Sequence, residues 1–295
     1  MESLLERIRR GDVLIADGAM GTMLFQRGLK PGACPEEINL SDPEVLVDIA
    51  ADYLDAGAEI IQTNTFGGSP LKLERFGFED RAEEINRLAV ESVRKAIGDR
   101  AYLSGSCGPS GRLIIPYGDT APEQIYESAE RQMRALADAG VDVICVETMT
   151  DITEAALNIR AAKAIAPDIP VMATMTFDRT PKGFYTIMGV TIENAADELT
   201  KAGADIIGSN CGHGSELMLK IAKEFKIRTS HPLIIQSNAG LPEIVDGVPI
   251  YPESPEYMAE NAGKLIEIGI SIIGGCCGTT PDHIRALRTL RDSMV

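Results

Sequence analysis

The sequence predicts a single (β/α)₈ barrel that takes in residues 1–295. Two patterns carry this prediction: short apolar runs bounded by turn residues, and segments of helical periodicity between them. Eight such runs occur, at residues 13–17, 59–63, 102–106, 142–147, 171–176, 205–210, 233–238 and 271–275. Eight strands that alternate with helices match the TIM-type barrel, whose usual size is about 250 residues.

Amphipathic segments fill most of the gaps between these runs. In residues 41–56, Leu46, Ile49 and Tyr53 fall on one helical face. Ser41 and Glu44 have the spacing of a capping box there, with Pro43 in the first turn. The other helical patterns span residues 122–139, 151–166, 192–202, 215–225 and 255–268.

Glycines at Gly57, Gly140, Gly203 and Gly269 each stand between a helical pattern and the next apolar run, where a glycine often ends a helix. A doubly wound open sheet is the alternative fold. No Ser/Gly-rich or Pro-rich linker divides the chain, so we expect one domain over residues 1–295. The longest irregular stretch after a strand is 241–255, which we interpret as a lid, an interface loop or a plain surface loop.

Composition narrows the classes of function. The chain has 28 Lys and Arg against 44 Asp and Glu, a formal charge of −16, and no basic cluster, which argues against binding to nucleic acid or an anionic membrane. No apolar stretch reaches the roughly 18 residues of a membrane span, and residues 1–10 lack the apolar core of a signal peptide. We therefore expect a cytoplasmic protein whose partner is a small molecule or a protein.

The C-terminal ends of barrel strands form one rim, and barrels of this type carry their sites there. The predicted strands lead at this rim into Asp17 and Gly18, residues 62–68, Glu147, Cys211, Asn238, and the pair Cys276 and Cys277. Six cysteines in 295 residues are too few for a disulfide scaffold. Three of them at matched strand ends predict a zinc site formed by Cys211, Cys276 and Cys277.

Three thiolates leave one position open on Zn²⁺. Asn238 or a water is expected to fill it as a labile fourth ligand. The complex would carry a net charge of −1, which suits a soft substrate thiol better than the activation of water. The pattern therefore predicts alkyl transfer to sulfur. His213 is the one histidine near a predicted ligand, and we interpret it as a loop residue.

Two carboxylates on the same rim, Asp17 and Glu147, fit the ammonium group of an amino-acid thiol. Glycines after the first two strands allow backbone N–H groups to approach a substrate carboxylate closely. These loops do not match a Walker or Rossmann fingerprint, so no nucleotide is expected. The predicted substrate-binding residues are Asp17, Gly18, Asn64, Phe66, Gly67 and Glu147.

Several motifs together resemble the homocysteine S-methyltransferase family, and in particular the homocysteine-binding module of cobalamin-dependent methionine synthase. They are residues 17–22 (DGAMGT), 62–66 (QTNTF), 147–148 (ET), 210–212 (NCG) and 274–281 (GGCCGTTP). The resemblance runs from about Gly11 to Arg288. It implies that the three cysteines hold zinc, that homocysteine sulfur becomes the fourth ligand, and that Asp17 and Glu147 hold the homocysteine amino group.

The source of the methyl group differs within the family. Cobalamin-dependent methionine synthase continues into further modules, whereas this chain ends at Val295. We therefore expect methylcobalamin on a separate corrinoid protein as the donor. S-methylmethionine and betaine are alternative donors, although a chain without tryptophan has few residues for an aromatic cage around betaine. A non-catalytic subunit that binds a thiol or zinc is the alternative from another functional class.

Overall fold

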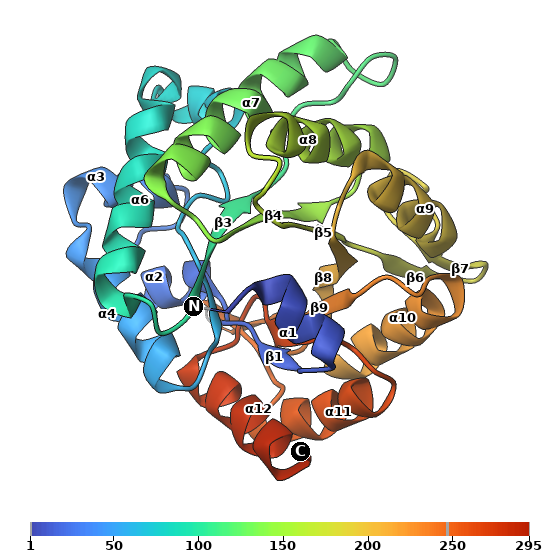
Figure 1. Cartoon of the computed structure of the whole chain (residues 1–295). Coiled ribbons are helices and arrows are strands. Elements are labelled where there is room, and N and C mark those ends of the chain that lie inside the picture. Colours follow the sequence, from blue (N-terminus) through green and yellow to red (C-terminus); the bar gives the residue numbers. More distant parts are fainter. Residues whose placement is uncertain (1, 246–247, 295) are drawn as a thin grey trace.

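The computed structural model describes residues 2–245 and 248–294. Its centre is an eight-stranded sheet of parallel strands in the order β1-β12-β9-β8-β5-β4-β3-β2 (Figure 1). The strands are β1 (Leu14–Ile15), β2 (Ile60–Gln62), β3 (Tyr102–Cys107), β4 (Val143–Met149), β5 (Val171–Met175), β8 (Ile206–Gly214), β9 (Leu233–Asn238) and β12 (Ile272–Gly275). All eight predicted strands are present, and β8 runs past its predicted end at residue 210.

The two edge strands of this sheet meet each other and close it into a barrel. A parallel bridge pairs Ala16 with Ile60. Backbone hydrogen bonds from Glu59 N to Ile15 O (2.7 Å) and from Asp17 N to Ile60 O (2.9 Å) reinforce the closure. The predicted (β/α)₈ barrel is thus confirmed, and the open doubly wound sheet is excluded.

Helices surround the barrel as an outer ring (Figure 1). The ring consists of α4 (Glu44–Asp55), α6 (Ala82–Ile97), α7 (Pro122–Ala139), α8 (Ile152–Ile165), α9 (Ile192–Ala202), α10 (Ser215–Arg228), α11 (Pro255–Glu267) and α12 (Pro281–Met294). Their apolar faces pack on the outward side chains of the strands in one large buried cluster. The predicted capping box at Ser41 is wrong: Ser41 ends a preceding short helix, α3 (Ile38–Ser41), and its hydroxyl donates to Glu37 O.

Side chains that point into the barrel form a second buried cluster. Each strand contributes to it, from Leu14 of β1 to Ile272 of β12, because alternate residues of a strand face opposite sides. Leu4 and Ile8 of the first helix, α1 (Leu4–Arg10), belong to the same cluster. Helix α1 therefore closes the N-terminal end of the barrel.

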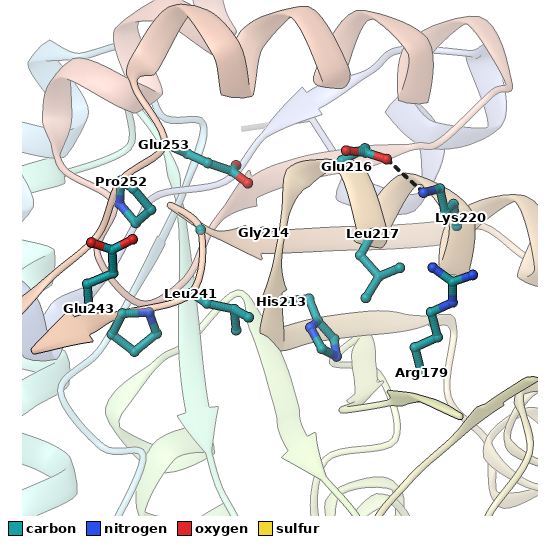
Figure 2. Close-up of a pocket in the computed structure, with 12 residues that line it drawn as sticks. Arg179, His213, Gly214, Glu216, Leu217, Lys220, Leu241, Glu243, Pro252 and Glu253 are labelled. Atoms are coloured by element: carbon teal, nitrogen blue, oxygen red, sulfur yellow. Dashed lines mark hydrogen bonds and ion pairs between the residues drawn. The ribbon is translucent and has the colours of Figure 1, made fainter. Parts of the chain in front are cut away.

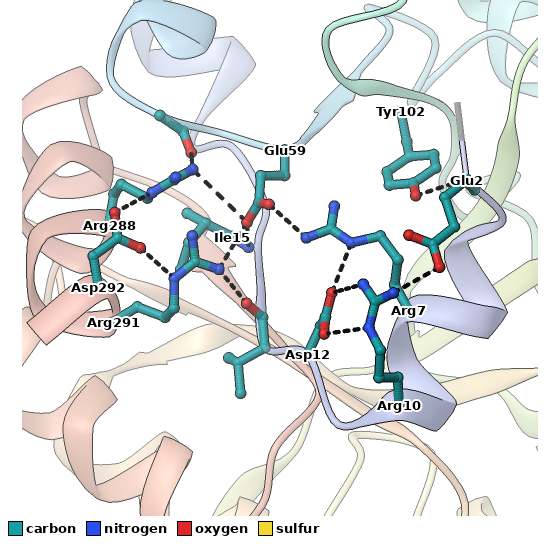
Figure 3. A network of polar contacts seen from close by, with 12 residues as sticks. Glu2, Arg7, Arg10, Asp12, Ile15, Glu59, Tyr102, Arg288, Arg291 and Asp292 are labelled. Atoms are coloured by element: carbon teal, nitrogen blue, oxygen red, sulfur yellow. Dashed lines mark hydrogen bonds and ion pairs between the residues drawn. The ribbon is translucent and has the colours of Figure 1, made fainter. Parts of the chain in front are cut away.

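Charged side chains fasten α1 and α12 to this end of the barrel (Figure 3). Glu59 accepts hydrogen bonds from Arg7 Nη2 (2.8 Å) and Arg291 Nη1 (2.9 Å). Its Oε2 also accepts from the backbone N of Ile15 at 3.2 Å. These contacts close the N-terminal end of the barrel, and the loops at the opposite end remain open.

The loops at the C-terminal end carry further short elements. Helices α2 (Met20–Gln26) and α5 (Pro70–Leu73) follow the first two strands, as do the 3₁₀ turns at Pro35–Glu37, Glu74–Phe76 and Glu79–Arg81. Hairpin β6 (Asp178–Thr180) and β7 (Gly183–Tyr185) follows β5. The stretch 241–255 is not wholly irregular, because Glu243–Val245 (β10) pairs with Val248–Ile250 (β11). Over the described ranges, no helix is long and apolar enough to cross a membrane.

Candidate metal centre and substrate pocket

Three cysteine sulfurs meet at the C-terminal rim of the barrel. Cys211 lies in the extended end of β8, and Cys276 and Cys277 directly follow β12. Their Sγ atoms all lie within 4.8 Å of one another, and Cys211 Sγ is 3.8 Å from Cys277 Sγ. Zinc–sulfur bonds of about 2.3 Å in a tetrahedron separate two sulfurs by about 3.8 Å. The sulfur positions therefore fit a zinc ion without rearrangement of this pair.

The backbone turn at the cysteine pair is tied to β9. Cys276 N donates to Ser237 O at 2.7 Å, and Ala239 N donates to Cys277 O at 2.9 Å. Gly278 completes the turn with a left-handed φ of 81°. A Cβ at this glycine would lie 2.0 Å from the ring of Tyr251, so no other residue fits there without a shift. The turn aims two adjacent sulfurs toward Cys211.

The three thiols influence one another's protonation. Hydrogen bonds lower the pKa of the Cys211 thiol, because they stabilise its thiolate. The bond from Cys276 has the larger effect and the bond from Cys277 the smaller one. Hydrogen bonding to Cys211 and Cys277, together with burial, raises the pKa of the Cys276 thiol. One sulfur of the cluster thus ionises most readily, and a cation would be needed to hold all three as thiolates.

A pocket of about 240 Å³ opens beside the sulfurs. The predicted residues that line it are Gly18, Asn64, Phe66, Glu147, Cys211, Cys276 and Cys277. Met20, Thr22, Gln62 and Thr148 line it as well. Phe66 is the aromatic side chain among the lining residues and is 38% exposed, which places it at the mouth.

Asp17 is buried at the end of β1 and is only half satisfied. Its Oδ2 accepts a hydrogen bond from Gln62 N at 2.8 Å. Its Oδ1 is buried and has no hydrogen-bond partner in the part of the chain that the structure describes. Burial raises the pKa of Asp17 to about 8, and the nearby charge of Glu147 adds to the shift. A cationic group beside Oδ1 would relieve this penalty.

Glu147 lies inside the barrel mouth with both oxygens engaged. Oε1 accepts a hydrogen bond from the Ser106 hydroxyl, and Oε2 accepts one from Asn210 Nδ2 at 3.1 Å. Burial raises the pKa of Glu147 to about 7, against the lowering effect of the Ser106 bond. Two buried carboxyls on one rim, both easier to ionise beside a positive charge, favour an ammonium ligand.

Three predicted residues have other immediate surroundings. Gly67 N donates to Glu36 Oε1 at 2.6 Å, so a substrate carboxylate would have to displace Glu36 to use this N–H. Asn64 Nδ2 donates to Pro35 O and to Asn39 Oδ1, each at 2.8 Å, and so holds the loop. Asp17, Gly67 and Asn238 do not line the pocket. Asn238 Oδ1, like Asp17 Oδ1, is buried and unpaired among the described residues.

The sequence profile of the homocysteine S-methyltransferase family matches residues 14–290. The chain belongs to this family. The methionine synthases of Mycobacterium leprae and Mycobacterium tuberculosis are 32% and 33% identical to it over 97% and 92% of its length. The chain spans 24% of the length of each of these relatives.

Solved structures agree on the fold of this family member. The metallated form of the homocysteine methyltransferase MmuM from Escherichia coli superimposes with a TM-score of 0.80 at 23% identity, over 97% of this chain and 99% of that one. The oxidised form of the same enzyme gives a TM-score of 0.79 over 98% of this chain and 99% of that one.

Glu36 is a charged pocket residue that the sequence does not predict. It is 4% exposed, lines the same pocket as Glu147, and its Oε2 lies 3.5 Å from Cys34 Sγ. Burial raises its pKa. A glutamate in a polar loop gives no local signal of burial, because its partner Gly67 lies 31 residues further along the chain.

A second pocket of about 470 Å³ opens beside the metal-site rim (Figure 2). It lies between the end of β8, the first turns of α10 and the stretch that follows β9. Charged side chains line it, among them Arg179, Lys220 and Glu243. His213 lies in β8, so its interpretation as a loop residue is wrong. It lines this pocket, with Nε2 3.3 Å from Asp178 Oδ1, and is not part of the sulfur group. Lys220 is paired with Glu216 at 2.7 Å.

Proposed function

We propose that this chain is a zinc-dependent methyltransferase that moves a methyl group onto the sulfur of homocysteine to give methionine. The observation that carries the proposal is the placement of three cysteine sulfurs within 4.8 Å of one another in the wall of a pocket that also contains Glu147. Family membership supports the same activity. A soft metal site beside buried carboxyls suits an amino-acid thiol.

Cys211, Cys276 and Cys277 are proposed to hold the zinc, with Asn238 as the labile fourth ligand. When bound, zinc supplies positive charge that favours the thiolate form of the substrate at neutral pH. In the transfer, the sulfur lone pair forms the new S–CH₃ bond, the donor keeps the electron pair of the bond that breaks, and the thiol proton leaves to solvent. The cysteines contribute electron-rich ligation that keeps the sulfur nucleophilic.

The remaining residues are proposed to bind the amino-acid end of the substrate. Asp17 Oδ1, buried and unpaired within the described ranges, is available to accept a hydrogen bond from the substrate ammonium. Glu147 supplies the second negative charge. Gly18 lines the pocket and is proposed to contact the substrate carboxylate through its backbone. A Cβ there would lie 2.6 Å from Thr279 Oγ1, so the packing around Gly18 favours glycine. Asn64, Phe66 and Gly67 complete this end.

Methylcobalamin on a separate corrinoid protein is proposed as the donor. Large apolar side chains are exposed on the loops around the mouth, as expected for a surface that receives a protein rather than only a small molecule. They are Phe66, Leu113, Ile115, Tyr117, Ile187, Leu241, Ile244 and Ile250. S-methylmethionine or betaine is the alternative donor. Betaine is disfavoured, because a cage for its quaternary ammonium needs several aromatic rings. Among the residues that line the pocket, Phe66 supplies one such ring.

We further propose that residues 1–295 act as one homocysteine-binding domain, with α1 and α12 joined to the same barrel through Glu59. A cytoplasmic location is proposed because the cysteine cluster needs reducing conditions to hold a metal.

The test is an assay of zinc-loaded protein with homocysteine against methylcobalamin bound to a corrinoid protein, free methylcobalamin, S-methylmethionine, betaine and methyl-folate. Methionine formed with the methylated corrinoid protein as donor supports the full proposal. Methionine formed only with a small-molecule donor would overturn the proposed donor and support homocysteine as the acceptor. No methionine from any donor, with tight binding of homocysteine, supports the alternative of a non-catalytic thiol- or zinc-binding subunit.

A further inference from the structure

Asn210 stands immediately before the metal-site cysteine of β8 and is fully buried. Its side-chain oxygen accepts hydrogen bonds from Thr148 N (2.9 Å) and Thr174 Oγ1 (2.8 Å). Its side-chain nitrogen donates to Glu147 Oε2 (3.1 Å) and Thr148 Oγ1 (2.8 Å). An amide has two donor hydrogens and two acceptor lone pairs, so its capacity is used in full.

Asn210 reaches both halves of the proposed substrate site. Its partner Glu147 is a carboxylate of the ammonium side. On the thiol side, Asn210 Nδ2 also lies 3.9 Å from Cys276 Sγ, and Cys211 is the next residue in the chain. The backbone is left-handed at Thr148 (φ 60°) and at Cys211 (φ 61°), a conformation that residues other than glycine rarely adopt. Asn210 lies between these two strained residues and bonds to the backbone of one of them.

The backbone of Asn210 is held as well. Thr176 Oγ1 donates to Asn210 O at 3.0 Å, at the point where β8 departs from regular pairing with β9. The side chain and the main chain of one residue thus fix the place where the β8–β9 register shifts, just before Cys211, and the direction in which Glu147 points. Strain of this kind persists only where the surroundings enforce it.

The chemistry of the amide is specific to this position. Aspartate in its place would bring a second carboxylate against Glu147 Oε2. Leucine would leave Glu147 Oε2 without a partner and would leave Thr148 N with only the longer hydrogen bond to Thr174 Oγ1, at 3.4 Å. An amide satisfies a backbone donor and a carboxylate at the same time. We propose that Asn210 is a positioning residue that sets the ammonium subsite at Glu147 against the thiol subsite at Cys211, and so makes the site select thiols that carry an amino group.

This inference rests on the proposed function, and a pair of thiols separates the two. Homocysteine and 4-mercaptobutyrate differ only in the amino group. In zinc-loaded protein, the ratio of their dissociation constants measures recognition of the ammonium, while the constant for 4-mercaptobutyrate measures the thiol subsite. Titration calorimetry with zinc content measured on the same samples gives both without any turnover.

Asn210→Ala should lower the preference for homocysteine by about tenfold while the affinity for 4-mercaptobutyrate changes by less than about threefold. Glu147→Gln should lower the same preference, and the double variant should lose little more than Glu147→Gln alone, because both substitutions remove one interaction. Asn158→Ala, which removes a buried amide bonded within α8, is the matched control and should keep the wild-type ratio.

If Asn210→Ala does not fold, Thr174→Val removes one of the two hydrogen bonds to Asn210 Oδ1 and should shift the ratio in the same direction by a smaller factor. Equal weakening of both thiols, with the ratio unchanged, would show a merely structural role and overturn the inference. Wild-type protein that binds neither thiol would overturn the proposed function and the inference with it.

Discussion

Cys211 Sγ lies 3.8 Å from Cys277 Sγ, although 66 positions separate the two residues in the chain. The barrel brings them together because β8 and β12 both pair with β9 and end at the same rim. A tetrahedral zinc–thiolate site needs this separation between its sulfurs.

Removal of one sulfur should abolish the metal site. Cys276→Ala leaves two thiols, and we expect zinc content to fall from about one per chain to a small fraction, with loss of methyl transfer. Zinc measured by elemental analysis after dialysis checks this. Cys145→Ala, in the barrel interior and outside the sulfur group, is the control and should retain zinc. Full activity in a metal-free Cys276→Ala protein would sink the proposed role of zinc.

The buried carboxylate of Asp17 should lower the stability of the substrate-free protein, although it helps to bind the substrate. Because burial raises its pKa to about 8, the folded protein holds this proton more tightly than the unfolded chain does, whose aspartates titrate near 3.9. Stability of the substrate-free protein should therefore fall as pH rises from about 4 to about 8, by at most about 1.4 kcal/mol per pH unit from this group.

Asp17→Asn removes that titration and keeps the shape. We expect the variant to unfold at a higher temperature than the wild type at pH 8, with the difference shrinking toward pH 4. Its affinity for homocysteine should drop by about tenfold or more, and its affinity for 4-mercaptobutyrate should stay the same. Identical pH profiles of melting temperature in the two proteins would contradict the role given to Asp17.

Gly278 should be needed for more than its left-handed backbone. Gly278→Ala adds a clash with Tyr251 to the conformational strain, and we expect a loss of at least about 2 kcal/mol of unfolding free energy together with weaker zinc binding. Gly11→Ala is the matched control: its φ is 98°, nothing lies within 4 Å of the new Cβ, and about 1 kcal/mol is expected. Tyr251→Ala should partly rescue Gly278→Ala; no rescue would place the cause elsewhere.

The exposed apolar side chains on the loops around the pocket mouth should affect the rate of methyl transfer only when the donor is a protein. Leu241→Asp and Ile244→Asp should slow methyl transfer from a methylated corrinoid protein about tenfold and leave the homocysteine dissociation constant unchanged. Ile227, 79% exposed at the end of α10 away from the rim, gives the control Ile227→Asp. A slowdown of equal size in the control would show that the rim is not a specific docking surface.

The sequence carried the fold and the three cysteines because each rests on a local pattern: apolar runs of strand length, glycines after helices, and cysteines directly after such runs. Glu36 and Asn210 were out of reach as site residues, since their roles depend on Gly67 and on Glu147, which lie far away along the chain. The capping box failed because Ser41 belongs to α3, where its hydroxyl bonds backward to Glu37 O. The hairpin within 241–255 was hidden by its prolines.

The central claim is that three cysteines bind a zinc ion with one position left for the substrate thiol. X-ray absorption at the zinc edge, recorded on zinc-loaded protein before and after addition of homocysteine, tests it most directly. We expect three sulfurs and one oxygen or nitrogen at zinc in the free protein, and four sulfurs with homocysteine bound. A sulfur count that stays the same after homocysteine saturates the protein would contradict it.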